Sequence, residues 1–252
     1  MGKEAREARQ RLKAQREAER ERERKKRIAT IVTVAVVAVG AVGAGWWFAA
    51  QSSQSEQPTT ALAPITRAAD GTVVMARPGV DKPVVDVYED FQCPACKSLE
   101  ETSAATLKNL AAEGRVKVVF HTVTIFPQDL FEGVTRANSV RAAAAARCVP
   151  AGPAWMTFHD RLFKEQPPED AEGFAIDDLV AWGEDAGVTD PNFATCVKNQ
   201  QHAAAHLADS DKTLQAAQID GTPTLKLNGA AVEQGTAFNP SALRQAVLDA
   251  AK

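Results

Sequence analysis

The chain has 252 residues, with 29 Lys and Arg against 32 Asp and Glu and a formal net charge of −3 at pH 7. The first 27 residues hold 12 of the basic and 6 of the acidic residues, which leaves 17 basic against 26 acidic residues in the remainder. A net charge of about −9 on that remainder argues against a nucleic-acid partner, and its length is ample for one folded domain.

Residues 1–27 are charged or polar and end in the basic cluster Arg24-Lys25-Lys26-Arg27. Because they lack an apolar stripe, they predict a solvated helix or a disordered cytoplasmic tail. The interleaved glutamates weaken a nucleic-acid interpretation of the tail, and the final cluster favours anionic lipids of the inner leaflet.

Residues 28–50 contain no charge and are long enough to cross a bilayer core of roughly 30 Å. The basic cluster before them predicts a cytoplasmic N-terminus and an extracytoplasmic remainder, and Trp46 and Trp47 suit the membrane interface. A cleaved signal peptide is the alternative. We favour an uncleaved anchor in the cell membrane, because both the charged lead and the apolar run are long for a signal peptide.

Residues 51–70 are polar and contain two prolines, so they predict a flexible linker. From residue 71 to residue 252 the composition is that of a globular domain. It opens with expected strands at 72–77 and 84–89, and a helix from Pro94 to about Glu113 follows.

Cys93 and Cys96 frame the start of that helix, in the sequence Cys93-Pro94-Ala95-Cys96. The positive end of the helix dipole and Lys97, one turn on, are expected to stabilise a Cys93 thiolate, with Cys96 as the resolving thiol. A structural disulfide and half of a zinc site are the alternatives. We favour a redox pair, because no second CxxC or His pair with ligand spacing accompanies it, and we expect no metal.

A strand at 115–125, parallel to 84–89, is expected next, and an all-helical insertion follows at about 127–217. The insertion holds Cys148 and Cys196, for which a structural disulfide fits better than a second redox pair, because neither has a CxxC partner. His202 and His206, four residues apart, are expected to be surface or packing residues rather than zinc ligands, and His121 and His159 are expected to be structural.

Strand character returns at 222–227, and the turn pair Asn228-Gly229 predicts a hairpin with residues 230–234. A last helix is expected to begin at Asn239-Pro240-Ser241. The expected order is therefore β-α-β, a helical insertion, then β-β-α.

This order and two motifs resemble the thioredoxin fold, and within it the membrane-anchored DsbA-like thiol–disulfide oxidoreductases of actinobacteria. Phe91-Gln92-Cys93-Pro94-Ala95-Cys96 is similar to the family's F-x-C-P-x-C, and Gly221-Thr222-Pro223-Thr224 is similar to its cis-proline loop. The resemblance covers about residues 72–252 and implies an α/β domain with catalytic Cys93 and Cys96.

The resemblance also implies that Thr222 and a cis Pro223 bind substrate beside the cysteines. Two positions depart from the family: Ala95 stands where some strong oxidants have His, and Val87 where many relatives have a buried acid. Glu89 or Asp90 would then supply proton transfer, with surface charge as the alternative.

The expected function is oxidation of cysteine pairs in exported proteins, with no cofactor. Reoxidation by a membrane protein of the DsbB-like or vitamin K epoxide reductase-like type is implied. A disulfide reductase or isomerase and a non-catalytic peptide-binding module are the alternatives.

The predicted topology can be tested by adding a protease to intact spheroplasts. The protease should digest residues beyond about 50 and spare residues 1–27, because the basic cluster holds the tail inside. Protection of the CxxC-containing domain would contradict the predicted location.

Overall fold

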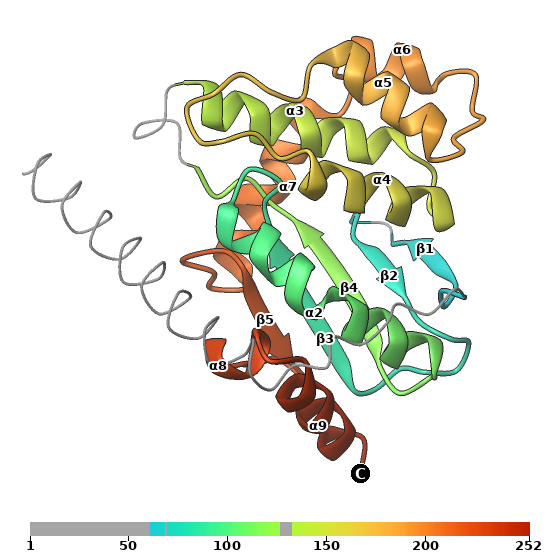
Figure 1. The fold of residues 1–252 in the computed structure, drawn as a ribbon, viewed down its shortest axis with the longest axis vertical. Helices are drawn as coiled ribbons and strands as arrows, with labels where there is room; N and C mark the ends of the chain where they lie inside the picture. Colours follow the sequence, from blue (N-terminus) through green and yellow to red (C-terminus); the bar gives the residue numbers. More distant parts are fainter. Residues whose placement is uncertain (1–60, 69, 127–132) are drawn as a thin grey trace, which may run out of the picture. The chain divides into compact units, whose positions relative to one another are not determined.

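The computed structural model describes residues 61–68, 70–126 and 133–252. The strands are β1 (Ile65–Arg67), β2 (Val73–Met75), β3 (Val84–Glu89), β4 (Lys117–Thr122), β5 (Thr224–Leu227) and β6 (Ala230–Ala231). The helices are α2 (Pro94–Ala112), α3 (Val134–Cys148), α4 (Pro153–Lys164), α5 (Ile176–Asp185), α6 (Phe193–Lys198), α7 (Ala203–Ala216), α8 (Gln234–Ala237) and α9 (Pro240–Ala250). Figure 1 shows their arrangement.

The predicted anchor at 28–50, the charged tail and most of the predicted linker lie outside the described residues. Among the residues that are described, no helix has both the length and the apolar character needed to cross a bilayer.

The six strands form one mixed sheet in the order β1-β2-β4-β3-β5-β6. β3 and β4 are parallel, with Val87 beside Phe120, and α2 connects them as the sequence predicted. The sheet begins earlier than expected, because β1 lies inside the predicted linker 51–70. It pairs with β2 and buries Ile65, so the linker interpretation is wrong for residues 65–67.

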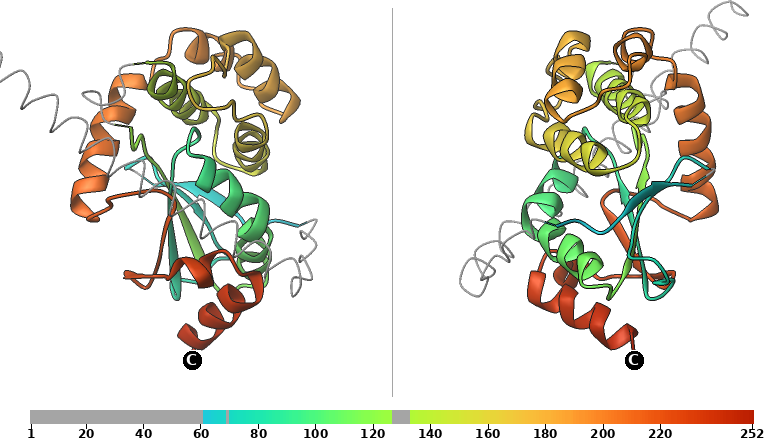
Figure 2. Two further views of the ribbon diagram at one scale, coloured as in Figure 1. Left: turned by 60° about the vertical axis from the view of Figure 1, so that its left-hand side comes forward. Right: turned by 90° about the vertical axis from the view of Figure 1, so that its right-hand side faces the viewer.

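Helices cover both faces of the sheet: α2 and α9 lie on one side and α7 on the other (Figure 2). The buried side of α2 presents Leu99, Leu107 and Leu110, whose spacing of three to eight residues keeps them on one face of a helix. These side chains pack in the same core as Val85 and Val87 of β3, which fixes the start of α2 relative to the central strands.

Five helices, α3 to α7, separate β4 from β5, so the helical insertion is confirmed from residue 133 onwards. Its first six expected residues, 127–132, lie outside the described part of the chain. One helix was missed. Residues 234–237 form the short helix α8, because the hairpin strand β6 ends at Ala231 instead of continuing to Gln234.

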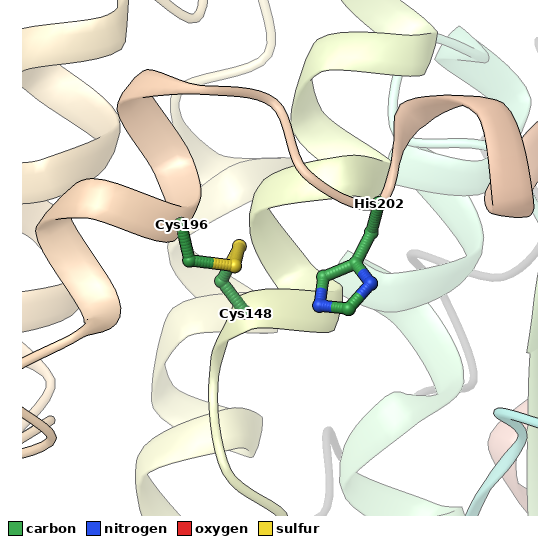
Figure 3. A group of neighbouring side chains, drawn as sticks. All are labelled: Cys148, Cys196 and His202. Atoms are coloured by element: carbon green, nitrogen blue, oxygen red, sulfur yellow. A yellow bond between two sulfur atoms is a disulfide. The ribbon is translucent and has the colours of Figure 1, made fainter.

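A disulfide joins Cys148 at the end of α3 to Cys196 in α6, with 5.9 Å between the two Cα atoms. This is the bridge that the sequence favoured. Figure 3 shows His202 beside it, and the nearest imidazole nitrogen and the two sulfurs lie within 4.8 Å of one another. The bond links helices that are 48 residues apart in the sequence and so restrains the insertion.

Replacing Cys148 or Cys196 by Ser should lower the midpoint of thermal unfolding. In the loop-entropy model, closing a loop of this length contributes roughly 4 kcal/mol, less any strain. The double variant should be no less stable than either single variant, since all three lose the same bond. Disulfide exchange at Cys93 should be largely unchanged. A loss of exchange activity at unchanged stability would indicate a second redox pair instead.

Candidate active site

Cys93 lies in the turn between the end of β3 and the first residue of α2. Its backbone N–H donates to the Asp90 carbonyl at 3.0 Å, and its own carbonyl accepts from the Cys96 N–H at 3.1 Å. Cys93 is the N-cap residue and Pro94 the first helical residue, where a missing N–H leaves no intrahelical bond unmade. Both thiols are free, so the structure describes the dithiol form.

The loop before β5 contacts the Cys93 thiol. The Thr222–Pro223 peptide bond is cis, as the family resemblance implied. Cys93 Sγ donates to the Thr222 carbonyl oxygen at 3.2 Å. The fold thus brings together two segments that are 129 residues apart in the sequence.

The two thiols differ in their acidity. A hydrogen bond from the Cys96 side chain lowers the pKa of Cys93, and this effect outweighs the opposing effect of burial, with Thr222 adding to the lowering. Burial raises the pKa of Cys96 well above its ordinary value, and the hydrogen bond to Cys93 raises it further. A single negative charge on the pair therefore resides on Cys93, the predicted nucleophile.

Lys97 does not take the role expected from the sequence. Its ammonium group donates to the Lys164 carbonyl at 3.1 Å, between α2 and α4. The lowered pKa of Cys93 comes instead from hydrogen bonds with Cys96 and Thr222.

Asp90 is a buried carboxylic acid next to the cysteines, and not the surface charge that was one alternative. It accepts hydrogen bonds from the Gln92 N–H at 2.8 Å, from the Ile125 N–H at 2.9 Å and from the Ser139 hydroxyl at 2.9 Å. Burial raises the pKa of Asp90 to about 6. The charge of Asp90, when ionised, raises the pKa of Cys93 and so opposes thiolate formation.

Glu89 is also buried, with 1% of the residue exposed, and its Oε1 lies 2.8 Å from Nε2 of His159. Val87 packs in the apolar core. Position 87 thus carries no acid. Buried acids occur instead two and three residues later, with Glu89 near His159 and Asp90 near the cysteines.

The segment after α4 covers the active-site turn, which the sequence did not indicate. The Gln166 amide donates to the Phe91 carbonyl at 2.8 Å and to the Cys93 carbonyl at 3.0 Å. The Gln92 amide donates to the Pro167 carbonyl at 2.9 Å. Cys93 is only 7% exposed in this setting. The partners of these hydrogen bonds lie more than 70 residues apart in the chain, beyond any local signal.

Three histidines away from the cysteines act in packing, as expected. His206 is buried and bonds to the Thr124 hydroxyl at 2.9 Å, and burial lowers the pKa of His206 to about 3, so it is neutral. His121 stacks on Tyr88 and lies 2.9 Å from Asp86. His202 is half-buried beside the disulfide, whereas His206 is fully buried. Although the two histidines are four residues apart, they therefore lie in different environments.

Residues 81–248 match the model of a family described as thioredoxin. The chain belongs to the thioredoxin family. A comparison with curated proteins finds no significant match.

Solved structures similar to this thioredoxin-family chain include two from Mycobacterium tuberculosis. One is the reduced disulfide bond oxidoreductase DsbG, with 28% identity over 74% of this chain and 86% of that chain and a TM-score of 0.59. The other is oxidised DsbA, with 27% identity over 75% of this chain and 92% of that chain and a TM-score of 0.58. The resemblance to DsbA-type proteins that the two motifs predicted is confirmed.

MdbA of Corynebacterium matruchotii, a thiol-disulfide oxidoreductase, is similar at 22% identity over 74% of this chain and 92% of that chain, with a TM-score of 0.60. At that identity the likeness concerns the fold alone.

Alkylation of the reduced thioredoxin-family domain as a function of pH tests the assignment of the nucleophile. With both thiols present and the alkylated residue identified by mass spectrometry, Cys93 should titrate below the free-thiol value of about 8.5 and Cys96 above it. Asp90→Asn should lower the pKa of Cys93 further, because it removes a negative charge, whereas Asp81→Asn at an exposed position should not. The assignment fails if Cys96 reacts first, or if Cys93 titrates at or above the free-thiol value.

Proposed function

We propose that this protein is an extracytoplasmic, membrane-anchored enzyme that oxidises cysteine pairs in exported proteins through a Cys93–Cys96 disulfide. The enzyme class, protein disulfide oxidoreductase, follows from the family and from the structural neighbours. The observation that carries the direction is the difference between the thiols: the pKa of Cys93 is lowered, and that of Cys96 is raised.

The reaction starts from the oxidised enzyme. A client thiolate attacks the Cys93 sulfur, the Cys93–Cys96 bond breaks, and Cys96 leaves as a thiolate that takes up a proton because its pKa is high. The second client thiolate then attacks the client sulfur of the mixed disulfide, and Cys93 leaves. The client loses two electrons and gains a disulfide, and the enzyme is left with two reduced cysteines.

The stabilised Cys93 thiolate favours this direction. A thiol with a lowered pKa is the better leaving group, and stabilising the reduced enzyme makes its disulfide more oxidising. Ala95 supplies no imidazole to stabilise the thiolate further, so a weaker oxidant than the strongest DsbA-like proteins is expected.

Thr222 and Pro223 are proposed to bind the client beside the nucleophile. The contact of 3.2 Å between the Thr222 carbonyl and Cys93 Sγ supports this role. A client strand that pairs with the backbone here would present its own sulfur next to Cys93.

The anchor and the partners rest on the sequence. The uncharged run 28–50, after the basic cluster, supports a single-pass protein whose catalytic domain lies outside the membrane. Each turnover reduces Cys93 and Cys96, so a membrane electron acceptor of the DsbB-like or vitamin K epoxide reductase-like type is the proposed reoxidant.

A second candidate function is a non-catalytic peptide-binding module. The low exposure of Cys93, 7%, favours it, whereas the lowered pKa of the same thiol favours the enzyme. The reactivity of Cys93 in the folded protein decides between them.

Trapping of clients is the direct test. Cys96→Ala should accumulate mixed disulfides with exported proteins that already carry a disulfide. The Cys93 thiolate attacks that disulfide by the reverse of the release step, and no Cys96 thiol remains to break the adduct. Cys93→Ser should trap none, and the unmodified protein, which keeps both active-site thiols, serves as the control. Absence of adducts with Cys96→Ala would favour the binding module.

The reduction potential of the Cys93–Cys96 pair then separates oxidase from reductase or isomerase. A value toward that of DsbA, about −120 mV, supports an oxidase, and one near that of thioredoxin, about −270 mV, supports a reductase.

A further inference from the structure

A second group of polar side chains lies buried between β3, α2 and α4, apart from the cysteines. Glu89 comes from the end of β3, Glu100 from α2 and His159 from α4. One ligand-type atom of each lies within 4.8 Å of the other two. His159 is fully buried and Glu89 is 1% exposed, while Glu100 is partly exposed, so the group reaches the surface on the side of α2.

One oxygen in this group has no partner. Glu89 Oε1 lies 2.8 Å from His159 Nε2, but Glu89 Oε2 is buried and makes no hydrogen bond. Leaving a buried carboxylate oxygen unpaired is costly, which is why such atoms normally bind a donor or a cation. The unpaired oxygen belongs to the same carboxylate as the oxygen that contacts His159, so a ligand at this place would satisfy it.

The geometry suits a transition-metal ion. Zinc takes His nitrogens and carboxylate oxygens at about 2.0–2.2 Å, which in tetrahedral geometry places neighbouring ligand atoms about 3.4 Å apart. His159 Nε2 and Glu89 Oε1 lie 2.8 Å apart, so these two atoms need to separate by only about 0.6 Å to hold an ion between them. On the other side of the ring, His159 Nδ1 lies 3.2 Å from Asp160 Oδ1, the kind of carboxylate partner that orients metal-binding histidines.

The charges also suit a divalent cation. The ionisable groups of the cluster and its outer partners are Glu89 from β3, Glu100 and Lys108 from α2, and His159 and Asp160 from α4, and Lys108 binds Asp160 at 2.7 Å. With the three carboxylates ionised, His159 neutral and Lys108 charged, these groups carry a net charge of −2. One divalent ion neutralises it.

We propose that Glu89, Glu100 and His159 form a binding site for a divalent transition-metal ion of the zinc class, with Asp160 as the outer partner of His159. Such an ion would tie the strand that leads to the CPAC turn to α2 and to α4. The ligands lie 11 and 59 residues apart in the sequence, on three elements, so no ligand spacing announces the site.

Without a bound metal ion, the ligand atoms of the cluster carry protons instead. Burial is the largest single effect on His159 and lowers its pKa, but the charges and hydrogen bonds of Glu89, Asp160 and Glu100 together outweigh it and raise the pKa of His159 to about 10. Burial raises the pKa of Glu100 to about 7. Zinc ligands bind in their deprotonated form, so binding of the ion displaces the proton shared between His159 and Glu89, and affinity should rise with pH.

The test is calorimetric titration of the full-length protein with ZnCl₂, with Cys93 and Cys96 oxidised so that thiolates do not bind the metal. One ion per chain is expected. Comparing buffers of different ionisation enthalpy should show release of at least one proton at pH 7, and tighter binding at pH 8 than at pH 6.

Variants assign the ligands. Glu100→Gln should weaken binding by at least about tenfold, as outer-shell losses alone typically cost 10- to 100-fold, and Asp160→Asn by about tenfold. Glu101→Gln, an exposed neighbour on α2, should stay within about twofold of the unmodified protein. Circular dichroism confirms that each variant is folded.

Two results would overturn the proposal. No saturable one-to-one binding at either pH would mean that the cluster is only a proton-sharing ion pair. Equal affinities for Glu100→Gln and Glu101→Gln would place any bound zinc elsewhere.

Discussion

The buried carboxylate of Asp90 holds together the parts of the chain that make the active site. It accepts one hydrogen bond from the CPAC turn at Gln92, one from the backbone after β4 at Ile125 and one from α3 at Ser139. The first segment carries the nucleophile and the last belongs to the helical insertion. A carboxylate taken from water into this place is destabilised unless such donors surround it, so the position of the turn and the position of α3 depend on each other.

This arrangement explains why the acidity of Cys93 is a balance. The same carboxylate that fixes the turn raises the pKa of Cys93, and burial acts in the same direction. Hydrogen bonds with Cys96 and Thr222 lower it, and the net effect is a lowered pKa. A nucleophile that is positioned by a buried acid thus needs a hydrogen-bond donor close to its sulfur, and Cys96 in the first turn of α2 provides one.

The helical insertion shapes the site from outside the thioredoxin core. Gln166, which follows α4, holds the carbonyls of Phe91 and Cys93, and the disulfide of Cys148 and Cys196 restrains helices of the same insertion. The Glu89, Glu100 and His159 cluster joins α4 to β3 and α2 on the inner side. The insertion therefore limits how much of Cys93 a client can reach.

The order of elements, the redox pair and the proline loop could be predicted from the sequence, because each leaves a local pattern. CPAC at a strand–helix junction, Thr222-Pro223 before an asparagine–glycine turn, and apolar residues at helical spacing all depend on neighbours within a few positions. The pairing of Cys148 with Cys196 could also be predicted from the sequence, since only two cysteines remained outside the CxxC motif.

What only the tertiary structure decided concerns residues whose environment is built by distant segments. Glu89 and Asp90 appear in the sequence as two acids after a strand, and nothing near them predicts burial or contact with His159 and Ser139. Lys97 is close to Cys93 in sequence, yet its ammonium group binds the end of α4, and the lowered pKa of Cys93 comes instead from Cys96 and from Thr222, 129 residues away. Charge and hydrogen bonding act through space over a few ångströms, so the fold, and not the spacing along the chain, determines which acid is buried and which thiol ionises.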